Sequence, residues 1–541
     1  MKKLFLISIT LFLIPFVSFT QNSWQWAITD GGLFNEVITA IDCDNEGNIY
    51  VAGLFQESFD FFGEDLVSTG SYDVLVACFN PQGNLRWVEQ GGGNFEDGPR
   101  DIYVDNQYVY VTGGFVEQAV FGDETLISAG ARDMFLLKYD LAGNLQWAVS
   151  GGSVTDDFGN SIAADDEGNI YQVGDINYTA TFGDFTVPHY GFTDIFIAKY
   201  NASGVCQWAT SAGGPIYENG SSIDVQGNNI FIGGGFNEEA VFGDTSVISV
   251  DFVDIFIAHY LTDGTFVDVV SAGGTNNENI TCLAVDSDLN VYVGGWFMID
   301  ITIGGNSFNS NGFNDAFLAK FEPGIGFNWS QQIGGVGLDE VMDLYCTMND
   351  QFIISGVFEN TITVGTTQLV SDGFDDGFVG KFDIAGIFDW VFQIGGSGSV
   401  KVDGCTADTS GNYYFTGDFL EELIIGNNIF NPVANYDLFM AQLGEGGTNI
   451  DENDHFNFPE ALVAPNPFST STTLEYKLKQ PEKVMLTIYD QMGKQVYNTE
   501  ENQPLGKQQL IWNAEEYTDG IYYFRLQAGD HVANGKMVKV R

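Results

Sequence analysis

Short runs in which apolar and polar residues alternate fill most of the chain, and they predict β-strands rather than helices. In the first complete unit these runs are residues 37–43, 49–55, 74–79 and 85–89, and they are rich in β-branched and aromatic side chains. Short glycine-containing turns separate the runs, as at residues 80–84, and such turns join antiparallel neighbours. The pattern therefore predicts units of four antiparallel strands.

This four-strand unit recurs along the chain at intervals of 60 or 61 residues. Each copy carries a variant of the motif Asp-x-Phe-x-Ala-Lys-Tyr, which begins at Asp73, Asp133, Asp194, Asp254, Asp315, Asp376 and Asp437. A Gly-Gly pair recurs with the same period, beginning at Gly31, Gly91, Gly151, Gly213, Gly273, Gly334 and Gly395. Repeated four-stranded units of this kind are the sequence signature of a β-propeller.

The two ends of the repeat region are complementary. A lone strand at residues 24–28 precedes the first unit, and the last unit ends at the strand 437–443 without its fourth member. If the first strand completes the last unit, no sheet edge is left open. We therefore expect an all-β fold in which residues 21–446 form a seven-bladed β-propeller of about 60 residues per blade, closed by the N-terminal strand.

The charge of the chain is concentrated in this repeat region. The whole chain has 73 acidic and 19 basic residues and a formal net charge of −54. Residues 1–20 hold two basic residues, and residues 460–541 hold nine basic and ten acidic ones, which leaves eight basic and 63 acidic residues in 21–459. A surface with so few cations excludes nucleic-acid backbones and anionic lipids as electrostatic partners.

The first twenty residues have the pattern of a secretory signal peptide. Lys2 and Lys3 precede the apolar run 4–17, which is followed by small and polar residues suited to cleavage. The run is shorter than the roughly 18–20 residues that span a bilayer, so an uncleaved membrane anchor is the weaker alternative. No later segment is apolar enough to hold the mature chain in a membrane.

Acidic residues recur between the Gly-Gly pair and the next unit. They are Glu36, Asp97, Asp157, Glu218, Glu278 and Glu340, and the seventh unit has Val400 and Lys401 near that place. On one face of a propeller they would focus a negative potential, so they are a candidate ligand face for a cationic or hydroxyl-bearing ligand or for a cation such as calcium. The alternative is that they cap turns and are solvated. The aspartates that open the third strand of each unit fit backbone capping better than metal binding.

Catalytic motifs are absent from the sequence. The four histidines, His189, His259, His455 and His531, lack metal-ligand spacing, and no nucleophile elbow or phosphate loop occurs. No cofactor is indicated beyond a candidate calcium ion. Sites assembled from distant blades remain open, because propellers can build them without a local motif.

The chain changes character after residue 446. Residues 447–459 read as a linker, and from 460 on the repeat stops and basic residues return. Alternating runs at 473–478, 484–489, 509–512, 522–526 and 536–540 predict a small β-sandwich of the immunoglobulin-like type.

This segment carries several short motifs near the C-terminus. They are Ala464-Pro465-Asn466-Pro467, Tyr489-Asp490-x-x-Gly493-Lys494, Asp519-Gly520-Ile521-Tyr522-Tyr523 and a closing stretch that begins Gly535-Lys536. Together and in this order they resemble the type A C-terminal sorting domain of the type IX (Por) secretion system. The resemblance implies Sec export into the periplasm and passage across the outer membrane of a Gram-negative bacterium. It also implies that the secretion machinery recognises residues 460–541 and that this domain is usually cleaved, which leaves the cargo secreted or on the cell surface.

The sequence thus favours an exported binding or adhesion module with an extracellular glycan or protein ligand. The alternative is a carbohydrate-active lyase or hydrolase that uses carboxylates on one propeller face as general acid and base. A purely structural surface protein is a third reading. The regular repeats and the missing catalytic motifs favour the first.

Overall fold

The computed structural model describes residues 22–426 and 428–444, and in the C-terminal part residues 462–464, 468–478, 482–490, 494–504, 506–514, 516–528 and 531–540. The chain divides into two compact units, one made of Gln21–Glu445 and the other containing the C-terminal part. The described residues form strands and turns without any helix. The predicted signal peptide and the predicted linker 447–459 lie outside the described residues.

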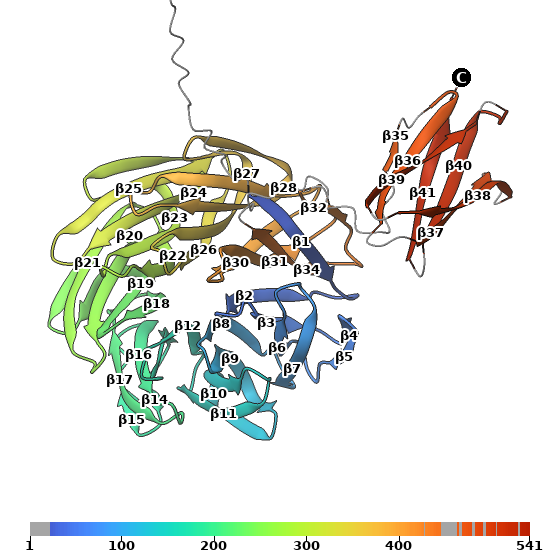
Figure 1. The fold of residues 1–541 in the computed structure, drawn as a ribbon. Coiled ribbons are helices and arrows are strands. Elements are labelled where there is room, and N and C mark those ends of the chain that lie inside the picture. Colours follow the sequence, from blue (N-terminus) through green and yellow to red (C-terminus); the bar gives the residue numbers. More distant parts are fainter. Residues whose placement is uncertain are drawn as a thin grey trace, which may run out of the picture. The chain divides into compact units, whose positions relative to one another are not determined.

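The strands of the first unit follow the sequence repeats (Figure 1). Strand β1 (Ser23–Asp30) comes first. The first repeat then has β2 (Val37–Cys43), β3 (Ile49–Phe55), β6 (Asp73–Phe79) and β7 (Leu85–Gly93), and the second has β8 (Gly98–Val104), β9 (Tyr108–Phe121), β10 (Glu124–Asp140) and β11 (Leu145–Gly152). The third has β12 (Phe158–Ala164), β13 (Ile170–Ile176), β16 (Asp194–Tyr200) and β17 (Cys206–Ala212), and the fourth has β18 (Glu218–Gln226), β19 (Asn229–Phe242), β20 (Thr245–Leu261) and β21 (Phe266–Thr275).

The remaining repeats continue the series. The fifth has β22 (Glu278–Val285), β23 (Val291–Ile303), β24 (Asn306–Glu322) and β25 (Gly326–Gly335), and the sixth has β26 (Asp339–Cys346), β27 (Phe352–Val364), β28 (Thr367–Phe382) and β29 (Phe388–Ile394). The seventh has β30 (Val400–Ala407), β31 (Asn412–Phe419) and β34 (Asp437–Gly444). Short hairpins extend three repeats: β4 (Ser58–Phe61) with β5 (Glu64–Val67), β14 (Ala180–Phe182) with β15 (Phe185–Val187), and β32 (Leu423–Ile425) with β33 (Asn428–Phe430).

Within each repeat the four strands pair antiparallel in chain order, as in β12-β13-β16-β17. The last repeat obtains its fourth strand from the other end of the unit. Strand β1 lies antiparallel to β34, with Ile28 opposite Met440, and completes the sheet β30-β31-β34-β1. The predicted pairing of the first strand with the last is therefore present.

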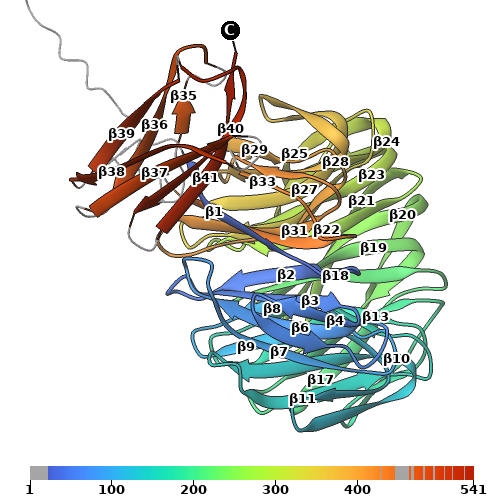
Figure 2. The same ribbon diagram turned by 90° about the vertical axis from the view of Figure 1, so that its right-hand side faces the viewer.

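The first strand of each repeat is its inner strand, and the inner strands contact one another in series. They are β2, β8, β12, β18, β22, β26 and β30, and β30 contacts β2 in turn. Figures 1 and 2 both show β2 and β3 beside β8 and β9. No sheet among the described residues closes on itself by hydrogen bonds, so the ring of contacts closes by packing between separate sheets. This arrangement is a β-propeller fold.

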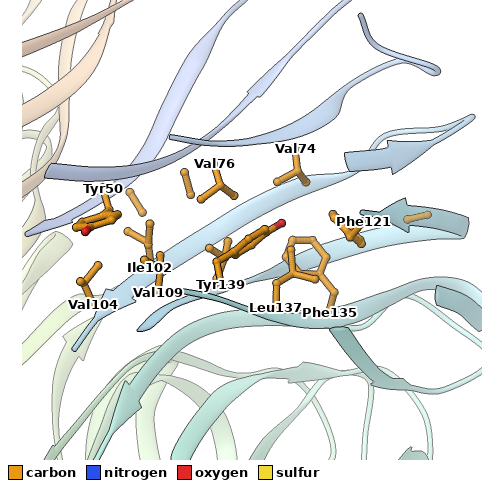
Figure 3. Packing of buried hydrophobic residues seen from close by; sticks show 14 of the residues in the cluster. Tyr50, Val74, Val76, Ile102, Val104, Val109, Phe121, Phe135, Leu137 and Tyr139 are labelled. Atoms are coloured by element: carbon orange, nitrogen blue, oxygen red, sulfur yellow. The ribbon is translucent and has the colours of Figure 1, made fainter. Parts of the chain in front are cut away.

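The hydrophobic core lies between neighbouring sheets. Figure 3 shows Val74 and Val76 of the first repeat packed against Ile102, Val109 and Leu137 of the second. Burying such aliphatic side chains contributes roughly 1.5–3 kcal/mol each. The tryptophans of the repeats lie between neighbouring sheets. Their indole N–H groups donate to turns of the following sheet, as Trp26 to Pro81 O, Trp87 to Leu141 O, Trp147 to Ala202 O, Trp208 to Thr262 O and Trp329 to Ile384 O.

Side-chain hydrogen bonds also tie each inner strand to the next. The backbone N–H groups of Val104, Ile162, Ile223, Leu283, Val285 and Cys405 donate to Asp42, Asp101, Ser161, Ser222, Asp224 and Asp343, respectively. Thr281 Oγ1 donates to Val341 O between the fifth and sixth repeats, and Thr406 Oγ1 donates to Asp42 at 3.1 Å between the seventh and the first. Every junction of the ring, including the closing one, therefore has a polar link.

The C-terminal unit contains two antiparallel sheets. One has β35 (Leu462–Ala464), β36 (Ser471–Leu478) and β39 (Gly506–Asn513), and the other has β38 (Gln495–Gln503), β37 (Glu482–Asp490), β40 (Gly520–Ala528) and β41 (His531–Lys539). Both sheets contribute to one core around the buried Trp512, whose ring lies 5.0 Å from that of Tyr522 and 5.6 Å from that of Phe468. All five predicted strands overlap observed ones, and β35 and β38 were not predicted.

Candidate functional site

Each inner strand has two ends, and each end presents a different set of polar groups. The connector is the segment from the Gly-Gly pair to the start of the inner strand, such as residues 31–36, and the connector face is the face formed by these segments. The turn face is formed by the turns that follow the inner strands, such as residues 44–48. Seven residues of extended chain separate the two ends of β2 by roughly 20 Å.

The acids predicted to form a ligand face are buried in the connectors. Glu36, Asp97, Asp157, Glu218 and Glu278 are all 0% exposed. Each accepts a hydrogen bond from the backbone N–H four residues earlier, on Gly32, Gly93, Ser153, Gly214 and Gly274, respectively. The geometry favours turn capping, the alternative reading of these residues.

In the sixth repeat, Asp339 rather than Glu340 occupies this position. Asp339 is 0% exposed and accepts the N–H of Gly335 at 2.7 Å. Glu340 is half-buried and accepts a hydrogen bond from Asn314 Nδ2 at 3.0 Å. Asp339 lies five residues after Gly334, as Glu36 lies five after Gly31. Asp97 lies six residues after Gly91, as Glu340 lies six after Gly334, so the spacing alone does not distinguish Asp339 from Glu340.

The aspartates that open the third strands are buried as well, and their predicted capping role is confirmed. Each accepts the backbone N–H of the residue four positions earlier; the seven acceptors are Asp73, Asp133, Asp194, Asp254, Asp315, Asp376 and Asp437. This loop geometry orders the chain just before each third strand.

The strand-opening aspartate and the connector acid of each junction come together beneath the Gly-Gly pair. A Cβ on Gly92 would lie 2.7 Å from Asp73 Cγ and 3.1 Å from Asp97 Oδ2, so only glycine leaves room for both carboxyl groups. In the fourth repeat, a Cβ on Gly273 would lie 2.0 Å from Asp254 Cγ. Glycine therefore recurs at these positions because carboxyl groups occupy the space that a side chain would need.

These paired carboxyl groups have raised pKa values. Burial, followed by the charge of Asp254, raises the pKa of Glu278 to about 9. Burial likewise raises the pKa of Glu218 to about 8 and that of Asp339 to about 7. No donor among the described residues reaches Asp254 Oδ1 or Glu278 Oε1, so a proton retained by Glu278 supplies the missing hydrogen.

At the junction between the sixth and seventh repeats, the strand-opening aspartate has no connector acid beside it. Val400 is 0% exposed at the position of the connector acid. The carboxylate of Asp376 instead accepts Gln393 Nε2 at 2.6 Å and the N–H of Gly396 at 3.3 Å. The connector thus folds without its acid when another donor satisfies the aspartate.

The turn face contains an open cavity of about 1080 Å³. Its lining comes from inner strands and turns of the first, second, third, sixth and seventh repeats, together with two neighbouring turns. Seven carboxylates, five tyrosines and two lysines line it: Asp42, Asp44, Asp105, Asp165, Asp166, Glu167, Asp408, Tyr103, Tyr108, Tyr110, Tyr345, Tyr413, Lys138 and Lys381. The cavity is therefore polar, aromatic and predominantly acidic.

Several of these groups have structural roles. Asp44 accepts the N–H groups of Glu46 and Asn48 at 2.9 Å and the hydroxyl of Tyr50 at 3.1 Å. Asp165 and Asp408 make the same set of bonds in their own turns. With these hydrogen bonds the sequence Asp-x-x-Gly-Asn, as at residues 44–48 and 165–169, forms a hairpin turn. Gly47 has φ of 77°, a conformation that glycine adopts without strain.

Lys138 also has a structural role, because its Nζ donates to Ala202 O at 3.0 Å and lies 3.6 Å from the ring centroid of Tyr108.

Tyr103 and Tyr345 occupy equivalent positions of β8 and β26 and are half-buried in the cavity wall. Burial, and then the charge of Asp42, raises the pKa of both hydroxyl groups, so each remains a neutral donor.

These two tyrosines were not predicted as site residues. The corresponding position in the seven repeats holds Asp42, Tyr103, Ala163, Asp224, Ala284, Tyr345 and Thr406. The repeat therefore does not fix the residue at this position, although Asp42 and Asp224 use it to accept backbone N–H groups of the next repeat. The position holds an acid in only two repeats, so the pattern of repeated acids does not point to it.

Among the described residues, no group of three or more His, Cys, Asp and Glu side chains is arranged to hold a metal ion. None of the described segments forms a helix long and apolar enough to span a membrane.

The residues of the sorting motif lie partly within the described C-terminal unit. Tyr522 is buried, and its hydroxyl donates to Thr518 O at 2.6 Å. Gly520 opens β40, and Gly535 and Lys536 pair with Phe524 and Tyr523 across β40 and β41. Pro465, Asn466, Pro467 and Gly493 lie outside the described residues.

Two curated proteins show weak similarity. The uncharacterized WD repeat-containing protein L264 of Acanthamoeba polyphaga mimivirus is 24% identical, with 74% of this chain and 36% of that protein covered. The regulatory protein FlaEY of Caulobacter vibrioides is 22% identical, with 62% of this chain and 35% of that protein covered. The chain thus spans about a third of the length of these relatives.

Solved structures with related folds are distant. A mutant of puromycin hydrolase is 9% identical, with a TM-score of 0.36 over 82% of this chain and 59% of the other. The WD40 β-propeller domain of Doa1 is 10% identical, with a TM-score of 0.28 over 78% of this chain and 97% of the other. Such low scores transfer no activity to this chain.

The C-terminal unit has a defined relationship. Residues 462–540 match the family described as secretion system C-terminal sorting domain. This match agrees with the motif order Gly520-to-Tyr522 and Gly535-Lys536 and with the two-sheet fold of the unit. The chain therefore carries a type IX C-terminal sorting domain that interacts with the type IX secretion machinery, and it is a protein with a β-propeller fold that is secreted or displayed on the outer-membrane surface of a Gram-negative bacterium.

Proposed function

We propose that the seven repeats are the seven blades of one propeller spanning residues 21–446, and that this propeller is an exported binding module. Residues 1–20 serve as its signal peptide, residues 447–459 as a linker, and residues 460–541 as an immunoglobulin-like domain that is cleaved after secretion. Seven four-stranded repeats and the pairing of β1 with β34 support the blade count. The type IX match supports the export route.

The cavity on the turn face carries the binding proposal. Its volume of about 1080 Å³ exceeds what a single small ion or a few waters would need, and it suits an oligosaccharide of a few residues. Tyrosine rings offer stacking surfaces, and carboxylate, amide and hydroxyl groups offer hydrogen bonds to sugar hydroxyls. With seven carboxylates against two lysines, the lining disfavours sulfated and uronate-rich glycans. The ligand class is therefore a neutral or amino-bearing glycan.

A lyase or hydrolase receives less support. A glycosidase needs one carboxyl group to act as acid and a second to act as base or nucleophile. Asp42, Asp44, Asp165 and Asp408 each accept two or more hydrogen bonds from the fold, which commits their oxygens to holding the strands and turns. Asp166 and Glu167 are exposed at the rim and come from one turn. A binding site requires no such free pair.

The test is a glycan array that holds neutral, amino-bearing, sulfated and uronate-rich oligosaccharides, probed with the secreted chain. Two matched variants distinguish the cavity from the rest of the turn face. Glu167→Gln alters the rim, whereas Asp288→Asn alters the same turn position in the fifth repeat, outside the lining. We expect signals on neutral or amino-bearing glycans that Glu167→Gln weakens and Asp288→Asn leaves unchanged. Binding confined to sulfated or uronate-rich glycans, or equal loss in both variants, would contradict the proposal.

A further inference from the structure

Four phenylalanines occupy one position of the repeat and are all exposed. Phe192, Phe252, Phe313 and Phe374 lie two residues before the strand-opening aspartates of the third to sixth repeats, and they are 74%, 54%, 74% and 75% exposed. The other three repeats have Ser71, Ala131 and Asn435 there. A single exposed aromatic residue needs no explanation, but four in consecutive repeats form an array.

The backbone holds these residues in equivalent places. The N–H of Phe313 donates to Gly337 O at 2.8 Å, and the N–H of Phe374 donates to Gly398 O at 2.9 Å. Phe192 makes the corresponding bond to Ile216 O at 3.1 Å. Each acceptor lies in a connector, so the rings belong to the connector face. Because equivalent positions of a closed ring of repeats lie at similar heights, the four phenylalanines belong to one face of the propeller.

The surroundings of the array are apolar and acidic. Val336, in the connector of the fifth repeat, is exposed, as are Tyr190 and Val250, each two residues before a phenylalanine of the array. Asp251 and Asp372 are exposed beside Phe252 and Phe374. Residues 21–459 carry eight basic and 63 acidic residues, so a polyanion would be repelled from this face.

We propose that the connector face binds the flat surface of an insoluble, uncharged β-linked polysaccharide through this phenylalanine array. Pyranose rings present apolar C–H faces that stack on aromatic rings, and chains in a flat insoluble array present such faces at regular intervals. Four exposed rings spaced by the repeat on one face suit that partner better than a curved protein surface or a short soluble glycan. This surface lies at the opposite end of the inner strands from the cavity and does not depend on it.

The test measures binding of the full secreted chain to microcrystalline cellulose and to chitin. The variant Phe192→Ser/Phe313→Ser/Phe374→Ser removes three rings. Its matched control is Val205→Ser/Ile325→Ser/Ile387→Ser, which removes three exposed apolar side chains from the turns between the third and fourth strands of the same repeats. We expect at least tenfold weaker binding by the first variant to one of the polymers, with the control unchanged and with little dependence on salt.

Several results would overturn the proposal. Wild-type chain that binds neither polymer, or the phenylalanine variant binding as well as wild type, would do so. If light scattering shows a wild-type dimer that the phenylalanine variant converts to a monomer, the array is a self-contact instead. The variant Glu167→Gln distinguishes the phenylalanine array from the cavity. It should bind the insoluble polymer as well as wild type does, even if its glycan-array signals are lost.

Discussion

At the connector end of each inner strand, carboxyl groups are buried in pairs beneath glycine and exposed apolar side chains. At the turn end, carboxylates surround an open cavity, and backbone and side-chain donors occupy many of their oxygens. Burial therefore raises the pKa of the connector residue Glu278 to about 9, whereas hydrogen bonds within its own turn lower the pKa of Asp165. The difference arises from the donors available: Glu278 has Asp254 as a neighbour, whereas Asp165 has N–H and amide donors from its own turn.

The connector acids are thus buried, whereas the acids that we propose for ligand binding lie at the turn face. Two buried carboxyl groups that share one proton carry one negative charge rather than two. A ligand in solution cannot reach them. The connector acids therefore stabilise the propeller, and the turn face remains the place where acidic and hydroxyl groups meet solvent.

The largest expected effect is that of Asp254→Ala. The substitution removes the acceptor of the Val250 N–H and leaves the Glu278 carboxyl without its neighbour. We expect the free energy of unfolding to fall by about 3 kcal/mol, as for other broken buried polar pairs. Thermal and denaturant unfolding of the secreted chain measure it. Asp251→Ala, at an exposed neighbouring position, is the control and should change stability by less than about 0.5 kcal/mol.

The second effect is a pH dependence of stability that has opposite signs for Glu278 in a connector and Asp165 in a turn. The pKa of Glu278 rises from 4.5 in the unfolded chain to about 9 in the fold, so the folded state binds more protons between these values. Its contribution to stability is complete below pH 4.5 and is lost as pH rises towards 9. Summed over the junctions, we expect a loss of about 2 kcal/mol or more between about pH 5 and pH 9.

For Asp165 in the turn of the third repeat the sign reverses, although burial raises the pKa of Asp42, another carboxyl group of the cavity, to about 7. Burial alone would raise the pKa of Asp165, but hydrogen bonds from Asn169 lower it below 3.8, so its contribution is lost as pH falls through that range. The control for the connector end is Glu218→Gln/Glu278→Gln, which should flatten the decline at alkaline pH. Stability that rises across that interval would contradict the shared proton. A gain from added calcium that this variant abolishes would instead make the pair a cation site.

The third and smaller effect concerns Glu278→Val, which copies the junction between the sixth and seventh repeats. Val400 is buried at this position without an acid, so the connector should accept valine. We expect a loss of about 1 kcal/mol, below that of Asp254→Ala, because Asp254 keeps the Val250 N–H as a donor. Unfolding midpoints of the two variants, recorded side by side at neutral pH, make the comparison. A larger loss for Glu278→Val would mean that the connector acid is the dominant member of the pair.

The fourth effect appears in binding rather than in stability. Tyr103→Phe removes one hydroxyl from the cavity wall and leaves the ring in place. We expect about fivefold weaker binding of the oligosaccharide with the strongest array signal, as for one lost hydrogen bond, and stability within about 0.5 kcal/mol of wild type. Titration calorimetry measures the affinity. Unchanged affinity would remove the Tyr103 hydroxyl from the site.

The sequence was sufficient to predict the strands and their order, because the fold repeats at a fixed period. The pattern at residues 37–43 and 49–55 recurs in each unit, and the lone strand at 24–28 pairs with β34, as predicted. The two-sheet arrangement of the C-terminal unit was also anticipated, although the short β35 carries too few residues for a visible alternation.

The site was predicted less well, and the reason is physical. Charge in a sequence does not indicate exposure, so Glu36 and Glu278 suggested a ligand face while the fold buries both against glycines. Repetition emphasised them, whereas Tyr103 and Tyr345 stand out only because their repeat position varies. Which variable positions meet in one cavity depends on ring closure, and no local pattern specifies that.

The most direct test of the central claim, that the turn-face cavity is the ligand site, is hydrogen exchange of the secreted chain with and without the oligosaccharide that gives the strongest array signal. The account predicts slower exchange on binding at residues 103–110 and 345–351, which line the cavity from the second and sixth repeats. Residues 286–290, the corresponding turn of the fifth repeat outside the lining, should exchange at an unchanged rate. Slowed exchange confined to the connectors, or to residues 286–290, would contradict the claim.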